Sequence, residues 1–144
     1  MKQEQEMTIN EFCVKYQGQK VDFDGFAGAQ CVDLARQFMK DVQDIPEHTG
    51  ACATSGGAKD LYLDYEKMSI EKKYFRQVNK DYKIGDLMVW GETSKNKFGH
   101  VAIFLACDPT NMSVLVFEQD GFAQDGAKYN WRPLSGVLGA LRLK

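Results

Sequence analysis

The chain has 144 residues, of which 44% are hydrophobic, and a formal net charge of -2 at pH 7. This length suits a single domain with one core, so we treat residues 1–144 as one domain. The mild acidity argues against nucleic acid as a partner, because phosphate binding requires a basic face. We expect no membrane partner either, because no apolar run approaches the roughly 20 residues of a membrane span and residues 1–7 do not resemble a secretory signal.

Helical patterns fill the first half of the chain. Thr8 and Glu11 form a capping-box pattern, and apolar residues follow at helical spacing as far as Gly18. A second helix is predicted over residues 31–42, with its apolar residues on one face. A third, short helix is expected at residues 61–65.

After residue 74 the pattern changes to short apolar or β-branched runs separated by turn residues. Helices followed by antiparallel strands are typical of an α+β fold. Residues 108–111, Asp-Pro-Thr-Asn, read as a hairpin connection between two of the strands. The predicted strands are residues 75–78, 87–90, 100–106, 113–118 and 137–143.

The cysteines and histidines show no metal-binding pattern. Cys13, Cys31, Cys52 and Cys107 contain no CxxC pair and have no ligand-like spacing with a histidine, which argues against a structural zinc site. We expect Cys13 and Cys107 to be small buried side chains and Cys52 to be a loop thiol. His48 reads as a surface loop residue and is the weaker candidate for a base.

A thiol, an imidazole and a carboxylate each lie at the edge of a predicted element. Cys31 begins the second helix, His100 opens an apolar strand, and Glu118 ends another. A sulfur nucleophile needs a base and a group that orients the base, so this set predicts a cysteine hydrolase. We expect Glu118 to accept the His100 N–H. The alternatives are a buried structural cysteine, a half-buried histidine without a catalytic role, and a carboxylate at the rim of the sheet.

Other residues are candidates for an oxyanion donor and for the walls of a substrate groove. Gln30 directly precedes Cys31, and its amide can donate to a developing oxyanion together with a backbone N–H. The alternative, an ordinary polar residue at a helix cap, is equally open. Aromatic residues more often pack in a core or at its rim than bind substrate. We nevertheless expect one or two of four candidates to line a substrate groove. The aromatic candidates are Trp90, Phe122, Tyr129 and Trp131.

Four segments together resemble the CHAP domains, which are cysteine, histidine-dependent amidohydrolases/peptidases of phage endolysins and bacterial autolysins. The resemblance implies a papain-like α+β fold, with N-terminal helices packed on an antiparallel sheet. It also implies Cys31 as nucleophile, His100 as base and Glu118 as orienting acid. The family often has Asn two residues after the acid, whereas this chain has Asp120, whose carboxylate cannot donate an amide hydrogen bond. The segments are residues 28–34, 84–90, 99–103 and 117–120.

The loop before the second helix resembles the first half of an EF-hand loop, in which oxygen ligands converge on calcium. Some phage CHAP lysins bind calcium at positions that match this loop and the following helix. The resemblance therefore implies a structural Ca²⁺ ion and no organic cofactor. The alternative is a solvated acidic turn. The corresponding ligands are Asp22, Asp24, Phe26, Gly28 and Asp33.

The function that the resemblance implies is hydrolysis of peptidoglycan amide bonds through a thioester. The enzyme would be an N-acetylmuramoyl-L-alanine amidase or a peptidoglycan endopeptidase. Two alternatives stay open: a papain-like peptidase or acyltransferase with a substrate outside the wall, and a non-catalytic wall-binding module. We expect a monomer that acts on the cell wall, after release from the host cytoplasm or as part of a virion. The chain is then either the whole protein or the catalytic domain of a larger lysin, with a wall-binding module or subunit elsewhere.

Overall fold

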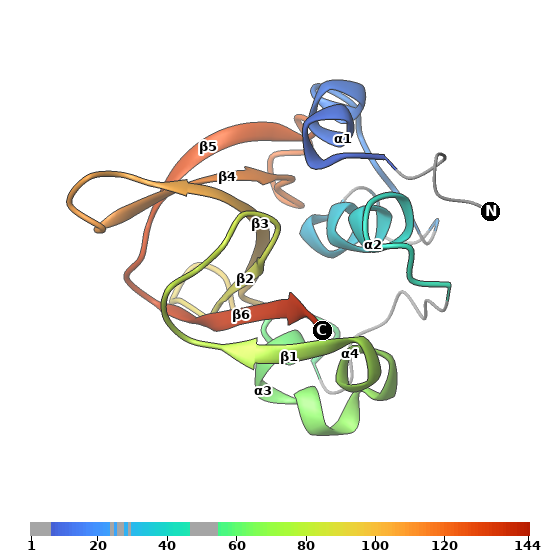
Figure 1. The fold of residues 1–144 in the computed structure, drawn as a ribbon. Helices are drawn as coiled ribbons and strands as arrows, with labels where there is room; N and C mark the ends of the chain where they lie inside the picture. Colours follow the sequence, from blue (N-terminus) through green and yellow to red (C-terminus); the bar gives the residue numbers. More distant parts are fainter. Residues whose placement is uncertain (1–6, 24, 26–27, 29, 47–54) are drawn as a thin grey trace.

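The computed structural model describes residues 7–23, 25, 28, 30–46 and 55–144 (Figure 1). The helices in this part of the chain are α1 Ile9–Tyr16, α2 Cys31–Asp41, α3 Asp60–Leu63, the 3-10 helix η2 Tyr65–Lys67, and α4 Ser69–Tyr74. The strands are β1 Phe75–Val78, β2 Leu87–Trp90, β3 His100–Cys107, β4 Ser113–Glu118, β5 Lys128–Pro133 and β6 Val137–Leu143. None of the described helices is long and apolar enough to cross a membrane.

The first two helices begin where the sequence predicts. The Thr8 hydroxyl accepts a hydrogen bond from the Glu11 N–H at 3.1 Å, and the Thr8 N–H donates to Glu11 Oε1 at 2.9 Å. This reciprocal pair is the predicted capping box, and it satisfies two of the amides that a helix start leaves unpaired. Cys31 is the first residue of α2, so the candidate nucleophile lies in the first turn of a helix.

The strands form one antiparallel sheet in the order β1-β6-β2-β3-β4-β5. The α+β prediction is therefore confirmed, and the expected hairpin at residues 108–111 joins β3 to β4. Two elements were not predicted. Strand β5 reads Lys-Tyr-Asn-Trp-Arg-Pro and lacks an apolar run, while α4 is six residues long and mostly polar.

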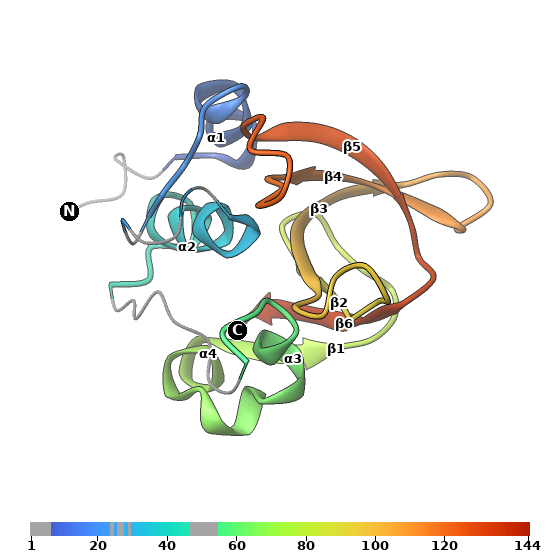
Figure 2. The ribbon, with the colours of Figure 1, turned by 180° about the vertical axis from the view of Figure 1, so that it is seen from behind.

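The helices all lie on one side of the curved sheet, as the two opposite views show (Figures 1 and 2). The main core lies between the helices and the sheet. Here the rings of Phe12 in α1 and Phe38 in α2 are 5.2 Å apart, and Phe117 of β4 packs on Phe12. A smaller apolar cluster covers the other face of the sheet and includes Trp90 and Phe104. Both faces are therefore packed, which fixes the register of the strands that carry the site.

The cysteines outside the site differ in burial. Cys13 of α1 is 2% exposed, as expected. Cys107 is exposed, so the prediction that it is buried is wrong. The reason is that β3 runs beyond the core, and the last residues of this strand are uncovered. Cys52 and His48 lie outside the described residues.

Gly99 fixes the entry of the chain into β3. Its φ angle of +75° lies in the left-handed region, and a Cβ added there would meet the Trp90 carbonyl oxygen at 2.4 Å and Lys59 Cβ at 2.8 Å. A glycine is required both by the backbone conformation and by the close approach of β2.

We expect Gly99→Ala to lower the free energy of unfolding by about 2–5 kcal/mol, because left-handed strain and overpacking add. Urea unfolding followed by tryptophan fluorescence measures this change. Gly18→Ala is the matched control, since Gly18 has a φ of +81° but open space around its Cβ position. Equal losses in the two variants would show that the close approach to β2 has no energetic weight.

Candidate active site

Cys31 and His100 face each other across a pocket of about 170 Å³. Cys31 comes from the start of α2 and is half-buried, whereas His100 comes from the start of β3 and is 8% exposed. The helix N-terminus and the end of the sheet thus meet at the pocket floor. Loops complete its walls at residues 56–58, 96, 98–99 and 120–122.

The imidazole of His100 bridges the thiol and a carboxylate. His100 Nε2 donates to Glu118 Oε1 at 2.9 Å, so Nδ1 is the nitrogen that remains for Cys31. Burial lowers the pKa of His100, but hydrogen bonds with Cys31 and Glu118 outweigh it and raise the pKa to about 9. His100 is therefore an imidazolium at neutral pH, the form that can give a proton to a leaving group.

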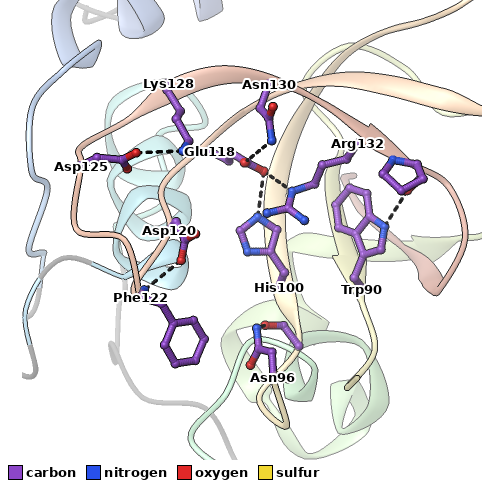
Figure 3. A network of polar contacts seen from close by, with 12 residues as sticks. Trp90, Asn96, His100, Glu118, Asp120, Phe122, Asp125, Lys128, Asn130 and Arg132 are labelled. Atoms are coloured by element: carbon purple, nitrogen blue, oxygen red, sulfur yellow. Dashed lines mark hydrogen bonds and ion pairs between the residues drawn. The ribbon is translucent and has the colours of Figure 1, made fainter. Parts of the chain in front are cut away.

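Glu118 is held by donors from two neighbouring strands (Figure 3). Its Oε1 atom accepts from His100 and from Arg132 Nε, and its Oε2 atom accepts from Asn130 Nδ2 at 2.9 Å. Burial raises the pKa of Glu118, yet the bonds from His100 and Arg132 outweigh burial and lower the pKa to about 2. The carboxylate is thus ionised at neutral pH.

An aromatic ring fixes the outer side of the histidine. Trp90 is cross-strand neighbour to His100, with ring centroids 5.9 Å apart, and its indole N–H donates to the Pro133 carbonyl at 3.1 Å. The Arg132 guanidinium carbon lies 5.7 Å from the centroid of the same ring, in a cation–π contact. Trp90 therefore packs against both His100 and the arginine that bonds to Glu118.

Arg132 and Asn130 were not identified from the sequence, because β5 was not predicted. Their signal is the alternation within β5, where polar residues at positions 128, 130 and 132 share one face and Tyr129 and Trp131 share the other. An apolar pattern search misses a strand whose polar residues point toward the site.

Gln119 is a second residue that sequence reasoning missed. Its side chain is 0% exposed and makes hydrogen bonds to the backbone at both ends of the loop that precedes α2. A glutamine directly after a strand has no distinguishing pattern in the sequence, so only the folded chain reveals this role.

The two auxiliary candidates both line the pocket. Gln30 is the exposed N-cap residue of α2, and its backbone N–H donates to Asp33 Oδ2 at 2.9 Å. Asp120 Oδ1 accepts the Phe122 N–H at 2.8 Å, so it closes a turn at the pocket rim (Figure 3). The oxyanion role of Gln30 and an auxiliary role of Asp120 stay predictions.

Part of the expected calcium set lies outside the described residues, namely Asp24 and Phe26. Asp22 and Gly28 are exposed, and Asp33 in the first turn of α2 is 4% exposed. Within the described residues, no three acidic, histidine or cysteine side chains converge on a metal-sized site. The calcium ligands therefore stay a prediction.

The aromatic candidates divide between the core and the surface. Phe122 is 70% exposed and lines the pocket, as does Phe98 from the opposite loop. Trp90 is buried, while Tyr129 and Trp131 are exposed on one face of β5, where the Tyr129 ring lies 5.1 Å from that of Phe117. The expectation that an aromatic residue lines the groove is met by Phe122 and by Phe98, which was not among the candidates.

A family model described as the CHAP domain matches residues 21–120, which is more than half of the chain. The chain belongs to the CHAP family. The matched segment of this CHAP domain includes Cys31, His100 and Glu118, whereas β5 with Asn130 and Arg132 lies beyond it.

Relatives of this CHAP domain include phage lysins. Over 105 residues it is 34% identical to Endolysin PlyTW of Staphylococcus phage Twort, a match that covers 69% of this chain and 20% of that protein. The crystal structure of the endolysin LysIME-EF1 is similar in fold, with a TM-score of 0.64, 20% identity, and coverage of 94% of this chain and 64% of the other. Ly7917, solved with "the hydrolyzing product of MDP", has a TM-score of 0.64 at 20% identity over 95% of this chain and 63% of its own. The CHAP domain thus spans about a fifth of the endolysin relative and just under two thirds of the solved chains.

The raised pKa of His100 predicts the alkaline limit of activity. With His100 as the predicted proton donor to the leaving group, we expect activity to fall as the pH rises through about 9. The contribution of the His100 ion pair to the stability of the folded state depends on pH in the same direction. It is complete below pH 6.5 and is lost as the pH rises through about 9.

We expect Glu118→Gln to move the alkaline limb of kcat/KM to lower pH, because the neutral amide no longer favours the imidazolium. A pH–rate profile of wild type and variant measures the displacement. Glu92→Gln is the control, since Glu92 pairs with Lys59 at the surface. An alkaline limb at the same pH in wild type and Glu118→Gln would remove Glu118 from the control of His100.

Proposed function

We propose that this CHAP domain hydrolyses amide bonds of bacterial peptidoglycan, with Cys31 as nucleophile, His100 as acid and base, and Glu118 as the orienting acid. The observation that carries the proposal is the pocket in which Cys31 meets an imidazole whose far nitrogen is bonded to a buried carboxylate. The relative PlyTW is named an endolysin, and Ly7917 was solved with a hydrolysis product of MDP, muramyl dipeptide. Both names support a wall substrate.

The first half of the reaction forms a thioester. The Cys31 thiolate attacks the carbonyl carbon of the scissile amide, and the oxygen takes the negative charge. The Cys31 backbone N–H and the Gln30 side-chain amide donate to that oxyanion. When the intermediate collapses, the C–N bond breaks and His100 gives its proton to the leaving amine.

The second half regenerates the enzyme. The neutral His100 takes a proton from a water molecule, whose oxygen attacks the thioester carbonyl. The C–S bond then breaks, a carboxylic acid leaves, and Cys31 and His100 return to the thiolate–imidazolium pair. Glu118 stabilises the imidazolium in both halves and holds the ring so that Nδ1 faces the sulfur.

The intact pair of Cys31 and His100 distinguishes an enzyme from a wall-binding module, because binding alone requires neither the thiol nor the buried imidazolium. The finer assignment is to an N-acetylmuramoyl-L-alanine amidase or to a peptidoglycan endopeptidase, and the two differ in the fragments that they release. We further infer that the domain acts on the wall as a monomer, released from the host cell or carried by a virion. A separate module or subunit would supply wall binding, in keeping with a match that covers only 20% of the endolysin relative.

We expect wild-type protein to release new amino groups from purified peptidoglycan, including that of Staphylococcus, and Cys31→Ala to release none. Mass spectrometry of the soluble fragments identifies the bond: a free lactyl carboxylate on muramic acid indicates an amidase, and new termini within the stem peptide or cross-bridge indicate an endopeptidase. Cys107→Ala is the matched control, because it removes an exposed thiol away from the pocket. Release by Cys31→Ala at the wild-type rate would exclude Cys31 as nucleophile.

We also propose that Ca²⁺ stabilises the loop that presents Cys31, held by oxygen atoms of Asp22, Asp24, Phe26, Gly28 and Asp33. Two observations suit such an ion. Val21 and Gln30, the two ends of the loop, are bonded to the same Gln119 side chain, which holds these ends together. Asp33 also places a buried carboxylate at the start of α2. Carboxylate and carbonyl oxygens are hard donors of the kind that Ca²⁺ prefers. The ion supplies positive charge among the carboxylates and has no role in the proton transfers.

Removal of calcium with EGTA should lower both the melting temperature and the activity, and added calcium should restore both. The stabilisation by a ligand that binds only the native state is about 2.7 kcal/mol at roughly 100 times its Kd. Asp24→Ala should abolish the response, whereas Glu66→Gln, an exposed carboxylate in η2, should retain it. Differential scanning fluorimetry in EGTA and in millimolar calcium measures the shift, and identical wild-type melting curves would leave the loop a solvated acidic turn.

A further inference from the structure

The Gln119 side chain is the most completely engaged buried amide near the pocket. Its Oε1 atom accepts the Val21 N–H at 2.8 Å, and its Nε2 atom donates to the Val21 carbonyl at 2.7 Å and to the Gln30 carbonyl at 2.8 Å. The side chain is 0% exposed. One side chain at the end of β4 therefore bonds to the residue that directly precedes the nucleophile.

The bond to Gln30 has a consequence for Cys31. The Gln30 carbonyl and the Cys31 N–H belong to one peptide group, which is planar and trans, so they point in opposite directions. With the carbonyl directed at Gln119, the Cys31 N–H is directed away from Gln119. Among the described residues this N–H has no hydrogen-bond partner, as expected for the first amide of a helix.

The Gln30 carbonyl has further donors that act in the same direction. It accepts the Asp33 N–H at 3.1 Å and the Leu34 N–H at 3.4 Å, the first bonds of α2. The Gln30 N–H in turn donates to Asp33 Oδ2 at 2.9 Å. Helix bonds set the carbonyl along the α2 axis, and Gln119 adds a bond from the sheet, which fixes the peptide relative to His100 and Glu118.

We propose that Gln119 is a positioning residue that orients the peptide group between Gln30 and Cys31, so that the Cys31 N–H serves as the oxyanion donor of the pocket. The inference deepens the proposed function and rests on Cys31 as its nucleophile. A donor on a fixed peptide needs no reorganisation when charge develops on the substrate oxygen, which is the condition under which such donors accelerate acyl transfer.

Two reactions of the same sulfur separate this role from a structural one. Hydrolysis of an amide passes through an oxyanion and needs the donor. Alkylation by iodoacetamide is a displacement at a saturated carbon, so it needs the thiolate but no oxyanion donor. If Gln119 only held α2 against the sheet, its loss would displace the sulfur from His100 and slow both reactions.

The test compares Gln119→Met, which keeps the length of the side chain and removes its hydrogen bonds, with wild type. Gln77→Met is the matched control, since Gln77 also donates from Nε2 to a backbone carbonyl, that of Tyr62 at 2.8 Å, but in exposed β1. Initial rates of amine release from solubilised peptidoglycan give kcat and KM. Site-resolved mass spectrometry gives the alkylation rate of Cys31, with exposed Cys107 as the reference in the same molecule.

We expect Gln119→Met to lower kcat by about 10²-fold, the effect of losing one oxyanion donor, with KM and Cys31 alkylation changed less than about threefold. Gln77→Met should leave all three unchanged. A parallel loss of hydrolysis and alkylation, or an unchanged kcat, would overturn the proposal. Gln119→Asn, which keeps an amide of shorter reach, provides the same comparison if Gln119→Met does not fold.

The experiment separates failure of the proposed function from failure of the proposal for Gln119. If wild-type Cys31 is alkylated no faster than Cys107, or the wild type releases no amines, the proposed function fails. If the wild type is active and its Cys31 reacts rapidly, the role of Gln119 is decided by one comparison. This comparison is between the loss of kcat and the loss of Cys31 alkylation rate in Gln119→Met.

Discussion

The buried negative charge of Glu118 is the constraint from which the geometry of the site follows. An isolated carboxylate with 1% exposure would be strongly destabilising, so it requires donors in fixed positions. His100 on β3 and the pair Asn130 and Arg132 on β5 provide them. The three strands must therefore keep their register for the charge to be tolerated, and the same register sets the direction of the imidazole.

The nucleophile belongs to a different part of the fold, and its alignment depends on the junction of helix and sheet. Cys31 is carried by α2, which packs on the sheet face opposite Trp90 through residues such as Phe38. Apolar packing of this kind sets the distance between the two layers but resists sliding only weakly. Directional hydrogen bonds act at the helix start, where the Gln30 carbonyl accepts from Gln119 and from the first amides of α2, and they orient the peptide group before Cys31.

The sequence was sufficient wherever a local signal decides the structure. The Thr8–Glu11 capping box and the apolar runs of β1, β2, β4 and β6 depend on neighbouring residues, and their boundaries agree with the structure. Strand β5 was not predicted because the side chains that it directs toward the site are polar. Asn130 and Arg132 bond to the carboxylate of Glu118 on β4. The expectation for Cys107 failed because periodicity indicates a strand but does not show how far the core extends beneath it.

For the candidate site, the sequence identified the groups with reactive chemistry and missed those that hold them. Cys31, His100 and Glu118 are recognisable because thiol, imidazole and carboxylate lie at the edges of elements. Arg132, Asn130 and Gln119 have ordinary sequence surroundings, and their contacts arise only from pairing between distant segments. Asp24 and Phe26 lie outside the described residues, so the calcium loop adds nothing to this comparison.

The distance along the chain between these groups affects when the domain becomes competent during synthesis. Val21 and Gln119 are 98 residues apart, and the strand that bears Arg132 comes later still. Contacts so distant in sequence close late in folding, because the chain entropy of the intervening loop opposes them. A nascent or truncated chain that ends before β5 contains the thiol and the imidazole but lacks two of the donors that hold Glu118. The assembled site thus requires β5 to have been synthesised, and a chain that stops before this strand carries the nucleophile without two of the donors that hold Glu118.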